Sequence, residues 1–170
     1  MPHSKIHLIL PAVVLVGAGV LLYAWQHDRD ARMIQRNLNR LRDNLEKEAT
    51  ETGAGAVRRS NRIPGFFAPD AGFRLAPHFP VPVDRRELAG HVFRARNALD
   101  TLEIDIPDRE LTIADSRRAA AMRVFAQAKA RFPDGQIERH ELEFEVEWIK
   151  EDGTWLIREV ILVQGVRNPR

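Results

Sequence analysis

The chain has 170 residues, of which 44% are hydrophobic and 29% are charged, and its formal net charge is only +2. These values are ordinary for one globular domain behind a targeting segment. The sequence contains no cysteine, which excludes disulfides, thiolate metal sites, a cysteine nucleophile and a lipidated cysteine anchor. Acidic residues interleave with the arginines, so we expect a mixed surface that does not bind nucleic acid.

The first predicted element is a membrane-spanning helix. Ile6–Trp25 is an uncharged, mostly apolar run long enough to cross a bilayer, and Tyr23 and Trp25 lie at its end as interfacial aromatics do. A cleaved signal peptide is the alternative. The apolar run continues past Gly17-Ala18-Gly19, the small residues that could form a cleavage site. An uncleaved anchor is therefore the better interpretation.

The charges on either side of this span bear on its orientation. Basic residues just after the span outnumber the single Lys5 before it, which favours a cytoplasmic C-terminal side. Against this, acidic residues separate those arginines, and a short basic tail before one apolar segment resembles a bacterial signal-anchor. We expect a tail and single span over residues 1–26, in the bacterial inner membrane, and a periplasmic domain over residues 27–170.

A helix with one apolar stripe is predicted to open the domain, over His27–Glu51. Ile34, Leu38, Leu41 and Leu45 step by four, three and four residues. We expect this stripe to pack on a sheet, and a short coiled coil is the alternative.

Two more helices and a short strand are expected before the main sheet. Ala56–Ile63 predicts a helix that ends at Pro64-Gly65, and Gly72–Ala76 predicts a strand. A further helix is expected over Asp84–Leu99, with Asp84 and Glu87 as a capping box at its start.

The C-terminal half predicts strands of an antiparallel sheet. Thr101–Pro107 and Arg109–Ala114 are expected as strands split by a proline, and Ala119–Arg131 as a longer one. His140–Trp148 alternates apolar residues with glutamates, which is typical of a strand with one dry face.

The two turns between the last strands fix the expected pairing. Phe132-Pro133-Asp134-Gly135 predicts a type I turn with a glycine bulge that pairs Val124 with Phe144. Lys150-Glu151-Asp152-Gly153 predicts the same device and pairs Trp148 with Leu156.

This second register assigns the faces of the last strand. It places Arg158 opposite Val146, and Gln164 opposite His140, on the dry face. The other face then carries an apolar stripe of Trp155, Ile157, Ile161 and Val163. Because such a stripe usually marks an interface, we expect a homodimer through it.

The order of these elements predicts an α+β fold with helices packed on a curved antiparallel sheet. The chain resembles the nuclear transport factor 2-like superfamily, also called SnoaL-like or cystatin-like α+β. Three pieces carry the resemblance, which covers roughly His27–Val166: Ile63–Asp70, Asp84–Leu99 and the closing meander around Lys150–Ile157. It implies a cone-shaped fold. The superfamily holds isomerases, dehydratases, cyclases and non-catalytic binding or assembly domains, so the fold does not select a function.

The resemblance implies that an enzyme of this fold works inside the cone with Asp, Tyr or His as acid and base. The only tyrosine of this chain lies in the predicted span. The polar residues expected in the interior are Arg158, His140 and Gln164, and the apolar residues expected around them are Phe144, Val146 and Met122. We expect His140 and Gln164 at the rim, whereas Arg158 either packs its stem or holds an anionic group. No metal, cofactor or catalytic residue is predicted.

The leading hypothesis is therefore a membrane-anchored, non-enzymatic domain that binds an apolar or anionic ligand or an envelope protein. The alternatives are a small lyase or isomerase that uses the cone pocket, and an assembly subunit of an envelope complex.

Overall fold

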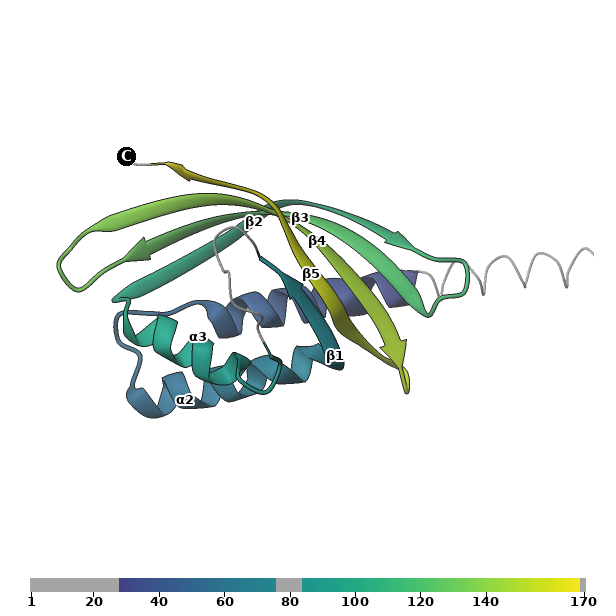
Figure 1. The fold of residues 1–170 in the computed structure, drawn as a ribbon, viewed down its shortest axis with the longest axis horizontal. Helices are drawn as coiled ribbons and strands as arrows, with labels where there is room; N and C mark the ends of the chain where they lie inside the picture. The colour runs from purple at the N-terminus through teal and green to yellow at the C-terminus, as the bar shows by residue number, and fades with distance from the viewer. Residues whose placement is uncertain (1–27, 76–83, 169–170) are drawn as a thin grey trace, which may run out of the picture.

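A computed structural model describes residues 28–75 and 84–168 of the chain. In it, helices cover the concave face of one curved sheet, so the predicted α+β class is confirmed (Figure 1). Within those two ranges, no helix is both long and apolar enough to cross a membrane. The span expected at Ile6–Trp25 lies outside the described residues.

The N-terminal helix occupies residues 28–45, and its apolar stripe packs on the sheet as predicted. Ile34, the first residue of the stripe, is fully buried. The helix ends before the predicted Glu51 because the next segment pairs with the sheet edge. There the Lys47 N–H donates to the Leu102 carbonyl at 2.9 Å, and the Leu102 N–H donates back at 3.0 Å.

A short helix and one helical turn lead to the first strand. Helix α2 (Gly53–Arg62) begins where the Thr52 hydroxyl accepts a hydrogen bond from the Gly55 N–H. The 3₁₀ turn η1 (Ile63–Phe66) follows, and β1 (Phe67–Arg74) starts earlier and runs longer than the sequence predicts.

Helix α3 (Leu88–Asn97) begins later than predicted. The Asp84 carboxylate accepts a hydrogen bond from the Arg86 N–H at 2.8 Å and closes a turn ahead of the helix. Glu87 occupies the N-cap position but makes no capping bond with its side chain. The predicted capping box is wrong because Asp84 uses its carboxylate in this local turn.

The sheet has five strands in the order β1-β5-β4-β3-β2. Its other strands are β2 (Thr101–Ile113), β3 (Ala119–Arg131), β4 (Ile137–Glu151) and β5 (Thr154–Asn168). Neighbouring strands are antiparallel except β1, which runs parallel to β5. The break predicted around Pro107 is a register shift between Asp105 and Asp108, and β2 continues past it. An edge strand tolerates such a proline because it has no partner on that side.

The first long hairpin has the predicted register. The Phe132 N–H donates to the Gln136 carbonyl at 2.9 Å, and Gly135 adopts a φ of 86°. Val124 pairs with Phe144 as expected.

The second hairpin differs from the prediction by one residue. Asp152 and Gly153 have φ values of 46° and 79°, as in a tight two-residue turn whose twist matches that of the strands. Trp148 therefore pairs with Ile157 and not with Leu156. A shift of one residue turns every side chain to the other face of the sheet, so Trp155 and Ile157 enter the core.

Two irregularities in β5 then change which side chains point to the concave face. The register shifts at Arg158 and at Val163, each an extra residue on this strand. Between them, Val160 pairs with Val146 and Leu162 pairs with Phe144, so both return to the concave face.

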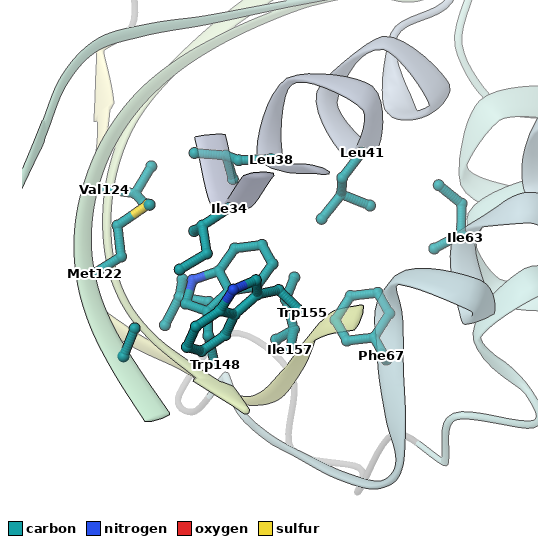
Figure 2. Close-up of a cluster of buried hydrophobic side chains, with 12 residues drawn as sticks. Ile34, Leu38, Leu41, Ile63, Phe67, Met122, Val124, Trp148, Trp155 and Ile157 are labelled. Carbon is teal, nitrogen blue, oxygen red and sulfur yellow. The ribbon is translucent and has the colours of Figure 1, made fainter. Parts of the chain in front are cut away.

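The core lies between the concave face and the helices (Figure 2). Trp148 and Trp155 are its largest fully buried side chains and lie below Ile34 of the N-terminal helix. Ile63 and Phe67 extend the same cluster toward β1.

Candidate functional site

The residues predicted to form a pocket do not lie together. Met122 and Val146 are buried beneath the N-terminal helix, in the closed part of the core. Arg158 sits on a bulge and is exposed to solvent, and Gln164 is exposed opposite Glu143. Arg158 departs from the predicted face because the turn at Asp152-Gly153 displaces the register, whereas Gln164 departs because of the extra residue at Val163.

His140 and Phe144 are half-buried on the concave face. The His140 imidazole hydrogen-bonds to the neighbouring Glu138 carboxylate at 3.2 Å. Of the six predicted pocket residues, these two lie where the concave face continues beyond the core.

The predicted dimer stripe is also divided. Trp155 and Ile157 are 0% and 1% exposed, so they belong to the core. Ile161 is half-buried, and Val163 is 48% exposed. A continuous apolar stripe on the outer face is therefore absent from the described part of β5.

One end of the N-terminal helix is fastened by a buried carboxylate. Asp30 is 4% exposed. Its Oδ1 accepts hydrogen bonds from the Lys150 ammonium at 2.6 Å and from the Trp155 indole N–H at 3.1 Å. The Asn37 amide, farther along the helix, donates to the Trp155 carbonyl at 3.0 Å. Because the carboxylate is paired with two donors, its burial is compensated.

The pKa of Asp30 reflects a competition between burial and these donors. Burial alone raises the pKa of this carboxyl, but the hydrogen bonds from Lys150 and Trp155 and the positive charge of Lys150 outweigh it. The pKa of Asp30 therefore lies below its ordinary value, and the group is ionised at neutral pH.

The other end of the N-terminal helix is capped by a buried arginine from α3. Arg96 is 1% exposed, and its guanidinium donates to the carbonyls of Asn44, Leu45 and Glu46 at 2.8, 2.7 and 2.6 Å. It also forms an ion pair with the Glu51 carboxylate. A helix leaves its last carbonyls without partners, and a cation is favourable at that end.

Lys47, just after the N-terminal helix, caps the C-terminal end of α3 in turn. Its ammonium donates to the carbonyls of Arg96 and Leu99, at the end of α3, at 3.0 and 2.5 Å. The two helices therefore cap each other: Arg96 of α3 caps the N-terminal helix, and Lys47, which follows the N-terminal helix, caps α3.

A third polar contact crosses the interior. Arg109 of β2 donates to the Asn39 side-chain oxygen of the N-terminal helix at 2.9 Å. With Asp30 and Arg96, it shows that the charged side chains between helix and sheet each have a protein partner, whereas the buried indole N–H of Trp148 has none. These groups hold the fold together and do not present an acid and a base to a substrate.

Sequence analysis missed Asp30 and Arg96, although their spacing carried a signal. Asp30 lies four residues before Ile34, so it shares the apolar stripe of its helix. Arg96 lies four residues after Val92 and shares the stripe of α3 in the same way. A charged residue in register with an apolar stripe indicates a buried, paired charge.

The described surface is hollowed mainly on the convex face, between rows of outward-facing side chains. One groove of about 320 Å³ lies between outward-facing side chains and crosses the paired residues Ile104, Ala128 and His140, whose own side chains point to the concave face. Its walls include Glu103 and Lys129, which form an ion pair at 3.2 Å. Among the described residues no group of histidines and carboxylates could hold a metal ion.

No protein-family model and no curated protein matches the chain. Solved structures do share its fold. A predicted scytalone dehydratase from Novosphingobium aromaticivorans has a TM-score of 0.68 at 14% identity, over 85% of this chain and 89% of that protein. A type 2 hexachlorocyclohexane dehydrochlorinase has a TM-score of 0.64 at 12% identity, over 83% and 93%.

A predicted calcium/calmodulin-dependent protein kinase II association domain from Xanthomonas campestris also matches. Its TM-score is 0.52 at 16% identity, over 65% of this chain and 78% of that protein. The expected nuclear transport factor 2-like fold is thus confirmed, and its neighbours include both enzymes and an association domain. At these identities the likeness concerns the fold alone.

We predict that Lys150→Met destabilises the domain by about 3–5 kcal/mol, because Asp30 is then buried without its cation. Arg158→Met is the matched control. It also removes a basic side chain near this hairpin, but an exposed one, and we expect a change within about 0.5 kcal/mol. Urea unfolding followed by tryptophan fluorescence measures both. Equal losses from the two variants would show that the Asp30 pair does not stabilise the fold.

We predict that the stabilisation from Asp30 depends on pH. Since its folded pKa is lowered, the contribution is complete above the ordinary aspartate pKa of about 4 and is lost as the pH falls through the folded value. The difference in unfolding free energy between wild type and Asp30→Asn should therefore be constant from pH 5 to 7, on the order of a few kcal/mol, and shrink below pH 4. A difference that grows on acidification would contradict this assignment.

Proposed function

We propose that the chain is a membrane-anchored domain of the nuclear transport factor 2-like fold that binds an apolar or anionic ligand, or a protein partner, without catalysis. The observation that carries this proposal is the packing of the N-terminal helix into the concave face. It fills the part of the interior nearest Ile34, and the charged side chains there, Asp30 and Arg109, already have protein partners.

The part of the concave face left to a ligand lies toward the first hairpin. Its inward-facing side chains are half-buried and mostly apolar: Ile104, Ala128, His140, Leu142, Phe144 and Leu162. In Figure 1 the sheet extends here beyond the N-terminal helix, on the side of α3. An apolar lining with one imidazole suits a small apolar molecule that carries a polar or anionic group.

The second candidate function is a small lyase, and one contact favours it. The Glu138 carboxylate accepts a hydrogen bond from the His140 imidazole and so orients the ring on the same concave face, as a general base requires. Two of the fold neighbours are described as a dehydratase and a dehydrochlorinase, both of which catalyse eliminations. The leading proposal remains binding, because no second acid or base faces His140 among the described concave side chains other than its own partner Glu138.

Membrane attachment is part of the proposal and rests on the sequence. The apolar run Ile6–Trp25 ends three residues before the described helix begins at residue 28. An anchor that ends at Trp25 would bring the Asp30 end of the domain next to the bilayer, since only four residues separate the two in the sequence.

We predict that Ala128→Trp fills the binding region and weakens ligand affinity at least about tenfold, since the indole occupies the space of a small ligand. Ala121→Trp is the matched control, because this alanine is exposed and faces outward on the same strand. The measurement is calorimetric titration with naphthalenesulfonate, an apolar anion, of the full chain in lipid nanodiscs with empty discs as the blank. Equal affinities for wild type and Ala128→Trp, or no binding by wild type, would contradict a ligand site here.

For the lyase alternative, the full chain is incubated with β-hydroxy carbonyl compounds and chlorinated cyclohexanes while elimination is followed by absorbance. Our proposal predicts no turnover above buffer. If His140 acts as base, turnover occurs and His140→Gln lowers kcat by about 10²–10⁴-fold. Such a loss, with an unchanged melting temperature, would replace the binding proposal by the lyase.

We predict that the full chain stays with membranes after carbonate extraction, and that deletion of residues 6–25 releases it. An alkaline phosphatase fusion after Arg170 should be active, because the domain is proposed to be periplasmic. Release of the intact chain by carbonate would exclude the anchor, and an inactive fusion would reverse the orientation.

A further inference from the structure

Opposite faces of this molecule carry opposite charge. The N-terminal helix carries four exposed arginines, Arg29, Arg32, Arg36 and Arg40, on the side away from its apolar stripe. We call them the arginine stripe. The helix turns by about 100° per residue, so these positions lie roughly opposite the core residue Ile34. None of the four forms an ion pair with another described residue.

The convex face of the sheet carries an acidic ridge along its central strand. Glu141, Glu143, Glu145 and Glu147 face outward from β4, the middle strand of five. Arg123 pairs with Glu143 at 3.3 Å and with Glu145 at 3.7 Å, which leaves Glu141 and Glu147 without an ion pair in the described part of the chain. Strands β2 and β5 add outward-facing carboxylates at Asp105, Glu110 and Glu159, of which Glu159 is paired with Arg74 at 2.7 Å.

The two charged rows match in spacing and direction. Arginines three or four residues apart on a helix are separated by roughly 5–6 Å along its axis. Glutamates two residues apart on a strand are separated by roughly 7 Å. Figure 1 shows the N-terminal helix running along the same long axis as the middle strands, with the described helices all on the concave side. The convex ridge is therefore free of any described helix.

We infer that the arginine stripe of one copy docks on the acidic ridge of a second copy, so that chains associate head to tail. A pair of complementary faces on opposite sides of one molecule is a heterologous interface, which repeats into a row and does not close as a dimer. Charge complementarity selects this partner, since two acidic ridges placed face to face would repel. The arrangement also differs from the symmetric sheet dimer expected from the sequence.

The test uses the full chain in a neutral detergent, which supplies no anionic lipid to the arginines. Sedimentation equilibrium at about 50 mM salt should show a mass that rises with concentration, and about 0.5 M salt should return it to one chain because exposed charges are screened. A wild-type chain that stays monomeric at low salt would overturn the inference and leave the stripe to anionic lipids.

Charge reversal then identifies the two faces. Arg32→Glu with Arg36→Glu, and separately Glu141→Arg with Glu147→Arg, should each weaken association at least about tenfold. Mixed together, the two variants should associate again as a row in which they alternate, since the acidic helix of the first meets the basic ridge of the second and the arginine stripe of the second meets the acidic ridge of the first. Arg58→Glu with Arg62→Glu is the matched control: it makes the same change of net charge on the exposed surface of α2 and should leave association unchanged. Unaltered melting temperatures show that the variants fold.

Cross-linking gives an independent result, because the natural chain has no cysteine. Chains with Arg36→Cys and chains with Glu147→Cys should be joined by a short bis-maleimide only when mixed. Joining of Glu147→Cys chains to one another would indicate a symmetric sheet dimer, and failure of the reversed variants to pair in the mixture would likewise overturn head-to-tail docking.

Discussion

The packing of one helix into the hollow of the sheet, with a buried charge at each of its ends, is the interaction on which this structure depends. Ile34 and its neighbours in the stripe bury apolar surface against Met122 and Val146, which supplies most of the driving force. The burial of apolar surface does not by itself fix the position of the helix along the sheet. Asp30 at one end and the capping Arg96 at the other set its position, because either charge would be costly if left unpaired.

This packing also limits what the interior can do. A helix that fills the hollow leaves little room near the two tryptophans, and the polar groups at its ends have already satisfied one another. In the same fold, an enzyme needs an open hollow and groups whose protons are free to move. Toward the first hairpin the described concave face carries His140 and half-buried apolar side chains, and this is the part that the proposed ligand would contact. One length of the same concave face is therefore packed against the helix, and the length toward the first hairpin is the part proposed to bind a ligand.

The fold class, the apolar stripe of the first helix and the register of the first hairpin could be predicted because each rests on a local pattern. The turn at Phe132–Gly135 and the alternation on both sides of it agree on one pairing. The predicted register of the second hairpin was wrong for two reasons. Asp152-Gly153 allows either a two-residue or a longer turn, and extra residues interrupt the alternation in β5. Because of that one-residue ambiguity, the prediction placed Trp155 and Ile157 on the outer face and Arg158 in the interior, whereas the two apolar residues are buried and Arg158 is exposed. The buried charges could not be assigned because their partners, such as Lys150 for Asp30, lie more than a hundred residues away in the sequence.

The parallel pairing of β1 with β5 joins the first and the last strand of the domain. β1 has no other neighbour in the sheet, so during synthesis it waits unpaired until the last strand has left the ribosome. Long-range pairing of this kind slows folding and leaves hydrophobic segments such as Phe67 uncovered in the meantime. A nonsense mutation within β5 would therefore remove the partner of β1 as well as the strand itself.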